Sequence, residues 1–184
     1  MYKRFAVLFT ALFTLLFALS ALSAAASAST SETYCIEVDI ANQITTVYRY
    51  SNRAVVRQMI CSTGTGDKTP LGSFRLQKTR ASTDRKEWYY ISTYHCYVKF
   101  ATRLKGGILF HSIPYNDMDL DSIDREALAQ LGSKASHGCI RLRWEDARWI
   151  AMNCPDGTRV RVFDDAETDS DLRQVLLEIG RAHV

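Results

Sequence analysis

The stretch Ser136-His137-Gly138-Cys139 contains the residue types of a cysteine acyl-transfer site. A thiol is an effective nucleophile only as the thiolate, which a nearby imidazole or oriented backbone amides favour. His137 stands two residues before Cys139, where an extended backbone places both side chains on one face. Gly138 has no Cβ, so a substrate carbonyl can approach the main chain and its N–H groups can stabilise an oxyanion. For this short motif taken alone, a buried structural cysteine beside a chance histidine is the simpler interpretation.

A second histidine, His111, ends an apolar run that begins at Ile108 and predicts a buried strand. A buried histidine needs a hydrogen-bond partner, so a packed structural residue is one interpretation of His111. Its place at a strand end, just before a turn, also suits a general base that faces a pocket. His95 lies among aromatic residues, and we expect it to be a packed or surface residue rather than a catalytic one.

The elements that must position these residues are mostly strands. Alternating apolar residues predict a β-meander over 35–40, 44–50 and 54–60, and further strands over 73–78, 88–91, 94–100, 108–113 and 158–163. Helical spacing predicts helices over 122–131, 144–153 and 172–179, the last one preceded by an acidic linker that begins at Asp164. This order predicts one mainly β domain over 34–163 with a few decorating helices, followed by the linker and helix of 164–184.

The N-terminus predicts export. Lys3 and Arg4 precede an apolar run over 5–19 and small residues that include Ala26-Ser27-Ala28, the pattern of a secretory signal peptide over 1–28. A short linker, 29–33, follows. The apolar run is shorter than the roughly 20 residues of a membrane span, and an uncleaved anchor is the alternative. We therefore expect a secreted, extracytoplasmic protein that meets a membrane only through this segment.

Net charge and cysteine spacing exclude several classes of function. The net charge of +3 falls to +1 once Lys3 and Arg4 are removed, so nucleic acid is not an expected partner. With Cys139 set aside, four cysteines remain and allow three pairings into two disulfides, with free thiols as a further option: Cys35, Cys61, Cys96 and Cys154. Their wide spacing argues against a zinc site, and we expect no metal and no cofactor.

Three features together resemble the L,D-transpeptidase catalytic-domain family. They are His111, the motif Ser136 to Cys139 followed by Ile140 and Arg141, and the loop from Thr65 to Gly72 with its Thr-Pro-x-Gly ending. The resemblance covers roughly Tyr34 to Phe163. It implies a β-sandwich or barrel of mixed sheets.

The resemblance also implies a role for each matching residue. Cys139 would be the nucleophile, His111 the general base, and the Ser112 backbone carbonyl the group that orients the imidazole. His137 and Gly138 would line the oxyanion hole, and Ser136 would hydrogen-bond to the residues that line it. Arg141 would order the site or bind a substrate carboxylate. The stretch between His111 and Ser136 is longer than is usual in the family. We expect its segment 115–131 to form a lid or wall, with His137 as the fallback base if that insertion displaces His111.

The activity that the resemblance implies is peptidoglycan cross-linking, and the resemblance therefore also implies that the protein is associated with the cell wall. Cys139 would attack the amide before the terminal D-Ala of a tetrapeptide stem, and the thioester would pass to another stem as a 3→3 cross-link. Hydrolysis of the thioester would give an L,D-carboxypeptidase, and the identity of the third stem residue stays open. Peptidoglycan stem peptides would be donor and acceptor, and carbapenems would be inhibitors. A sortase- or papain-like enzyme and a catalytically silent wall-binding domain are the alternatives from other classes.

Overall fold

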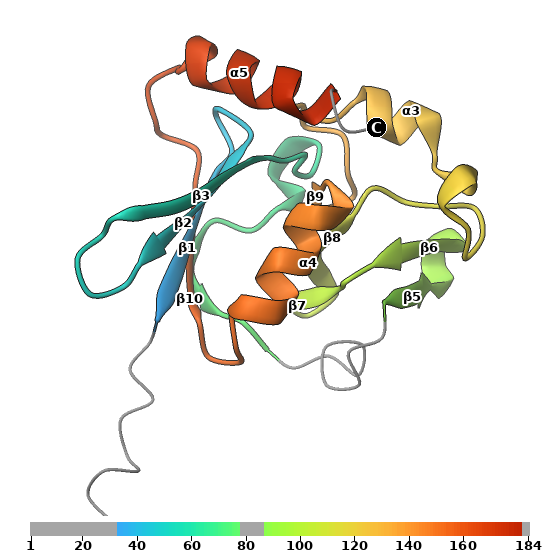
Figure 1. Ribbon diagram of the computed structural model, residues 1–184, viewed down its shortest axis with the longest axis horizontal. Coiled ribbons are helices and arrows are strands. Elements are labelled where there is room, and N and C mark those ends of the chain that lie inside the picture. Colours follow the sequence, from blue (N-terminus) through green and yellow to red (C-terminus); the bar gives the residue numbers. More distant parts are fainter. Residues whose placement is uncertain (1–32, 78–86, 182–184) are drawn as a thin grey trace, which may run out of the picture. The chain divides into compact units, whose positions relative to one another are not determined.

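A computed structural model describes residues 33–77 and 87–181, and the expected signal peptide over 1–28 lies outside them (Figure 1). The strands are β1 (Tyr34–Asp39), β2 (Ile44–Arg49), β3 (Val55–Ile60), β4 (Gly72–Arg75), β5 (Trp88–Ile91), β6 (Cys96–Lys99), β7 (Thr102–Lys105), β8 (Ile108–Ser112), β9 (Ile140–Leu142) and β10 (Arg159–Phe163). The helices are α3 (Arg125–Ala129), α4 (Trp144–Asn153) and α5 (Ser170–Arg181), with short 3₁₀ turns η1 (Gly66–Lys68), η2 (Ser92–Tyr94) and η3 (Leu120–Ser122). No helix in these described ranges has the length and apolar character of a membrane span.

The largest sheet has five strands in the order β3-β2-β1-β10-β4. Its first three strands form the antiparallel meander that the sequence predicts. The last strand, β10, then lies parallel to β1, with Cys35 beside Arg159 and Asp39 beside Phe163. The sheet is therefore mixed, and it joins the two ends of the domain.

A second sheet has the order β7-β8-β9, and β8 and β9 run parallel. The sequence did not predict β7 or β9. Strand β6 begins at Cys96, later than expected, because the preceding residues form η2 and His95 has a left-handed backbone with φ 50°. Helix α3 is shorter than the predicted 122–131, since Asp124 caps it by accepting bonds from the Glu126 and Ala127 N–H groups.

The hydrophobic core lies between the two sheets and α4. Phe110, Ile140 and Leu142 from the second sheet pack in one cluster with apolar residues of β1 and β10. Ile150 contributes from α4, which lies next to β8 in Figure 1. Each side chain of this size stabilises the fold by about 1.5–3 kcal/mol when buried. The fold is mainly β with mixed sheets and few helices, as the sequence predicts.

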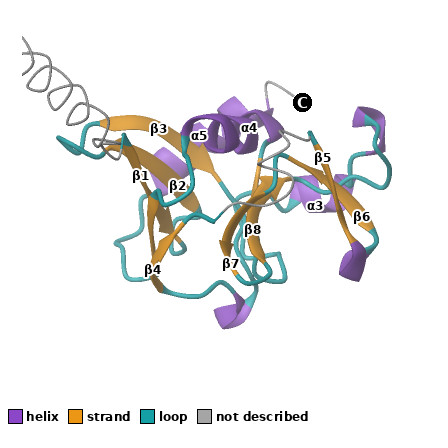
Figure 2. Ribbon diagram, turned by 90° about the horizontal axis from the view of Figure 1, so that it is seen from below, coloured by secondary structure: helices purple, strands orange, loops and turns teal. Residues whose placement is uncertain are grey.

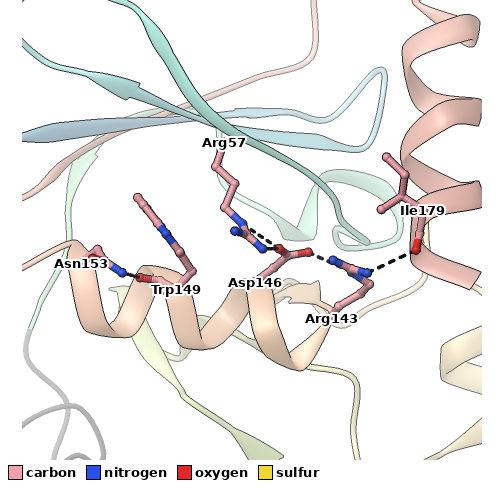
Figure 3. A network of polar contacts seen from close by, with 6 residues as sticks. All are labelled: Arg57, Arg143, Asp146, Trp149, Asn153 and Ile179. Carbon is pink, nitrogen blue, oxygen red and sulfur yellow. Dashed lines mark hydrogen bonds and ion pairs between the residues drawn. The ribbon is translucent and has the colours of Figure 1, made fainter. Parts of the chain in front are cut away.

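Buried Asp146 of helix α4 connects this helix to β3 and α5 (Figure 3). Its Oδ1 accepts two bonds from Arg57 of β3, at 2.6 and 2.9 Å, and its Oδ2 accepts one from Arg143 at 3.2 Å. Arg143 also reaches the carbonyl of Ile179 in α5 at 3.5 Å. Two arginines satisfy one buried carboxylate, which ties β3, α4 and α5 together.

Of the alternatives that the sequence leaves open for the cysteines, the structure has free thiols. No disulfide joins the five described cysteines. Cys35, Cys61 and Cys154 are buried, whereas Cys96 and Cys139 are partly exposed.

Candidate active site

The pairing of β8 with β9 brings the catalytic candidates together. In this parallel ladder Phe110 pairs with Ile140 and His111 with Arg141, so the register places Leu109 beside Cys139. Residues two apart on a strand share one face. Cys139, His111 and Arg141 therefore lie on the face opposite to the core side chains of Phe110 and Ile140. Figure 2 shows β7 and β8 between the five-stranded sheet and the β5–β6 hairpin.

His111 is buried, with 2% of its surface exposed. Its Nδ1 lies 2.5 Å from the Ser112 carbonyl oxygen. A carbonyl only accepts, so Nδ1 carries the hydrogen and Nε2 keeps a lone pair. The Ser112 hydroxyl is itself fixed, because it accepts a bond from the Lys99 N–H at 2.8 Å and donates one to the Ile113 carbonyl at 2.7 Å.

The pKa of His111 is lowered from 6.5 to about 4, chiefly by burial. The hydrogen bond to the Ser112 carbonyl acts in the opposite direction, and the charge of Arg141 adds to the lowering. The imidazole is thus neutral near pH 7. A neutral ring with a lone pair on Nε2 can accept a proton, which is what a general base must do.

Burial also raises the pKa of the Cys139 thiol, while a hydrogen bond to the Leu109 main chain and the charges of Arg141 and Arg103 act in the opposite direction. The thiol donates to the Gly107 carbonyl, with 3.6 Å between sulfur and oxygen. Both shifts favour the uncharged forms of the two catalytic candidates.

The loop that carries the cysteine is closed by Ser136, which is almost fully buried. Its hydroxyl donates to the Cys139 carbonyl at 2.6 Å and accepts from the Gly138 N–H at 3.0 Å. The second bond occupies the Gly138 N–H, a donor that the family resemblance assigns to the oxyanion hole. The backbone N–H groups of His137 and Cys139 are the other candidate donors of this motif.

A second loop supports the first from behind. Buried Thr69 donates to the Gly138 carbonyl at 2.9 Å and accepts from the Gly64 N–H at 2.7 Å. Gly64 packs so closely that a Cβ there would lie 2.9 Å from the Cα of Gly138. Ser62 exchanges two backbone bonds with Arg141, at 2.9 and 2.8 Å. The segment after β3 thus pairs with β9 along its free edge and holds the cysteine loop in place.

The cysteine and His111 open into a cavity of about 370 Å³. One wall is the β5–β6 hairpin, which contributes Tyr89, Tyr90, Ile91, Tyr94 and Cys96 among others. The expectation that 115–131 forms the lid or wall is wrong, because no residue of this fully described segment lines the cavity. Instead, Tyr97 and Tyr115 exchange backbone bonds of 2.8 Å, so the segment supports the hairpin from outside.

His137 lies at the rim of the cavity with an exposed ring. Tyr94 stacks on that ring at 4.5 Å between centroids and 22° between planes. This contact joins the tip of the hairpin to the cysteine loop. His95 is exposed too, but it does not line the cavity, and its Nδ1 lies 3.2 Å from the Tyr90 hydroxyl.

Five residues to which the resemblance assigned a role line the cavity: Cys139, His111, Ser136, His137 and Arg141. Ser112 and Gly138 are not among the lining residues, and they contact His111 and Ser136 through their main chains. Sequence reasoning missed Thr69, Arg103, Tyr94 and Cys96. Thr69 stood inside the Thr-Pro-x-Gly signature without an assigned contact, and Cys96 was considered only as a possible disulfide partner. Arg103 and Tyr94 gave no signal in the sequence. Within the described residues no group of three His, Cys, Asp or Glu side chains could hold a metal ion.

A model of the YkuD family, described as the L,D-transpeptidase catalytic domain, matches residues 33–162. The chain belongs to this family. It is similar to Putative L,D-transpeptidase YciB of Bacillus subtilis, with 35% identity over 131 residues that cover 68% of this chain and 63% of YciB. The chain therefore spans about three fifths of that relative.

Solved structures show the same family fold. The L,D-transpeptidase of Mycobacterium smegmatis superimposes with a TM-score of 0.55 at 22% identity, covering 71% of this chain and 58% of that one. The L,D-transpeptidase LdtMt1, solved in complex with imipenem, gives a TM-score of 0.52 at 23% identity, covering 71% of this chain and 59% of that one. At sequence identities of 22% and 23%, these two comparisons show that the fold is shared.

Proposed function

We propose that this chain is an exported, cysteine-dependent L,D-transpeptidase that forms 3→3 cross-links between peptidoglycan stem peptides. The observation that carries the proposal is the shared face of the β8–β9 ladder: neutral His111, oriented by Ser112, opens into the same cavity as Cys139. The family match supports the reaction class, and the N-terminal sequence over 1–28 supports export.

In the first half-reaction Cys139 attacks the carbonyl of the third stem residue. His111 Nε2 takes the thiol proton as the sulfur–carbon bond forms, and the Cys139 N–H donates to the oxyanion. The carbon–nitrogen bond then breaks. D-Ala leaves with the proton that His111 returns to its amine, and a thioester remains on Cys139.

In the second half-reaction the side-chain amine of another stem attacks the thioester. His111 takes the amine proton and gives it to the departing sulfur, which restores the thiol. Arg141 and Arg103 line the cavity and supply positive charge for the carboxylates that stem peptides carry. The imipenem complex of LdtMt1 supports carbapenems as inhibitors of this chain.

Mass analysis of muropeptides tests the proposal. The purified protein is incubated with a disaccharide-tetrapeptide, and products are separated by liquid chromatography. A cross-linked dimer with one D-Ala released per bond is the expected product. Tripeptide without dimer would mean that water is the acceptor and the chain is an L,D-carboxypeptidase. Unchanged tetrapeptide would overturn both activities.

A further inference from the structure

The described residues that line the catalytic cavity include two arginines and no acidic residue. Arg103 and Arg141 are the arginines, and none of the described lining residues is an aspartate or a glutamate. A concave site lined by charge of one sign attracts ligands of the opposite sign. The cavity therefore favours a substrate that brings carboxylates close to the nucleophile.

The two arginines lie on different sides of the reacting groups. In the antiparallel β7–β8 ladder Arg103 pairs with Leu109, and the β8–β9 register places Cys139 beside Leu109 on the other side. Arg103 thus shares a face with Cys139, two strand spacings or about 10 Å away at Cα. Arg141 instead pairs directly with His111. Arg141 is therefore on the side of the general base, and Arg103 is on the other side.

This arrangement assigns a different part of the donor stem to each arginine. The departing D-Ala must lie towards His111, because in the proposed reaction that imidazole protonates its amine. Its carboxylate is only three bonds from the reacting carbon and falls near Arg141. The third stem residue stays on the acyl side, so its side chain extends over Leu109 towards Arg103.

The turn between β7 and β8 limits the distance from Arg103 to the nucleophile. Nη1 of Arg103 donates to the Gly106 carbonyl, and the Cys139 thiol donates to the carbonyl of the next residue, Gly107. Because consecutive Cα atoms are about 3.8 Å apart, the guanidinium and the sulfur are roughly 6–10 Å apart. Within residues 33–77 and 87–181 the Arg103 side chain has no second hydrogen bond and no ion pair, so other N–H groups of its fork can meet a ligand.

We infer that Arg103 is a specificity-determining residue that binds a carboxylate on the side chain of the donor's third residue. A diamino dicarboxylic acid at that position has this carboxylate six bonds from the reacting carbon, or about 7 Å in an extended chain, which matches the place of Arg103. Guanidinium and carboxylate groups pair bidentately. The inference rests on the proposed function and specifies its donor.

A third residue with only an amine on its side chain fits the cavity less well. It would place an ammonium group near Arg103 and Arg141, and no acidic residue among the described lining residues balances it. An unpaired like charge of this kind disfavours the wrong ligand. In a diamino dicarboxylic acid the carboxylate on the same carbon balances the ammonium.

The stem offers one other carboxylate, on the D-glutamate that precedes the third residue. This residue leads towards the sugar, which is too large to share the cavity with the reacting end. The cavity volume of about 370 Å³ is at the low end of the roughly 300–1,000 Å³ of ligand sites, so only part of the stem fits inside. We therefore assign Arg103 to the third residue, and the experiment separates the two carboxylates.

Four disaccharide-tetrapeptide donors test the inference through kcat/KM for D-Ala release. The reference donor has diaminopimelate as its third residue. The second has the side-chain carboxylate of that residue amidated, the third has lysine instead, and the fourth has only its D-glutamate amidated. The reference and fourth donors should react about tenfold to a hundredfold faster than the other two. Equal rates for the reference and second donors, or a slow fourth donor, overturn the inference.

Variants at Arg103 assign the preference to this side chain. Arg103→Gln should bring the ratio of kcat/KM between the reference and second donors close to one. The ratio is the readout because Arg103 also lowers the pKa of Cys139, and that effect is common to both donors. Arg103→Lys keeps the charge and should keep part of the ratio. Arg148→Gln, which changes an exposed arginine of α4 outside the cavity, should keep the full ratio. An unchanged ratio in Arg103→Gln overturns the inference.

Calorimetric binding to Cys139→Ala separates this inference from the proposed reaction. The variant has no nucleophile, and it should still bind the reference donor at least about tenfold more tightly than the second donor. This preference without D-Ala release by the original protein would contradict the reaction and support the role of Arg103. Equal affinities, or no binding of either donor, overturn the inference.

Discussion

Thr69 donates a hydrogen bond of 2.9 Å to the carbonyl of Gly138, the residue directly before Cys139. The same hydroxyl accepts a bond of 2.7 Å from the Gly64 N–H. One buried side chain therefore joins the loop after β3 to the loop that carries the nucleophile. Its position in the Thr-Pro-x-Gly signature gains a physical explanation: it fixes the peptide plane before the catalytic cysteine.

Replacement of Thr69 by valine should reduce D-Ala release and stability together. Valine has nearly the same shape but leaves the Gly64 N–H and the Gly138 carbonyl unpaired, at a cost of about 1–3 kcal/mol for each buried group. Thr69→Ser retains the hydroxyl and is the matched control. The measurements are kcat/KM for D-Ala release and the midpoint of thermal unfolding. Equal behaviour of the valine and serine variants would show that the hydroxyl has no such role.

Gly138→Ala should abolish activity and destabilise the protein. Gly138 has φ +125°, and a Cβ there would lie 2.7 Å from the Lys68 carbonyl oxygen. Gly157→Ala is the control, because φ is +87° and nothing lies within 4 Å of its Cβ. The control should lose only the roughly 1–2 kcal/mol of a left-handed backbone. Urea unfolding of the two variants compares the costs, and a smaller loss for Gly138→Ala would contradict the packing described here.

The buried imidazole predicts a pH dependence of stability. Burial holds the pKa of His111 at about 4, against an ordinary value of 6.5. Between these values the unfolded chain binds more protons than the folded one, so the free energy of unfolding should fall as pH is lowered from 6.5 to 4. The loss should amount to roughly 3 kcal/mol at most. Above pH 6.5 this contribution should be constant.

Urea unfolding of the original protein and of His111→Gln at several pH values isolates this effect. The difference between the two proteins should shrink as pH falls through the window. His95→Gln, which changes an exposed histidine, should follow the original protein. A His111→Gln curve parallel to that of the original protein would refute the assignment of a buried neutral ring.

Arg141 should act on both catalytic groups at once. Its charge lowers the pKa of Cys139 and the pKa of His111. In Arg141→Gln the thiol should therefore need a higher pH to react, while the acid limb of kcat/KM should move to a higher pH. Iodoacetamide labelling followed by peptide mapping reports the thiol, because burial raises the pKa of Cys61 and of Cys154 to about 12. Shifts in opposite directions for the two limbs would contradict a shared electrostatic origin.

The strands were predictable where local alternation marks them, as in β1 and β2. Strand β9 was not, because its three residues are held by partners distant in the sequence, β8 and Ser62. Helix α3 was predicted too long, since the apolar spacing continues upstream of the Asp124 cap. Non-local pairing decides such elements, and the spacing of apolar residues does not record it.

The candidate site was likewise predictable only where local sequence indicates it. The residue types at Cys139 and His111 indicated cysteine acyl-transfer chemistry, and the family resemblance assigned the role of general base to His111 rather than His137. The cavity wall formed by the β5–β6 hairpin was not predicted, because Tyr94 contacts His137 only once the hairpin has folded. The acidic segment 115–131 was expected there by its length, but it lies outside the cavity.

The central claim is that Cys139 carries the acyl group. Intact-protein mass spectrometry after incubation with meropenem, followed by peptide mapping, measures this directly. One covalent adduct on Cys139 is the expected result, with none on Cys139→Ala, which should also release no D-Ala from the tetrapeptide. An adduct on Cys96, which lines the same cavity, or D-Ala release by Cys139→Ala would contradict the account.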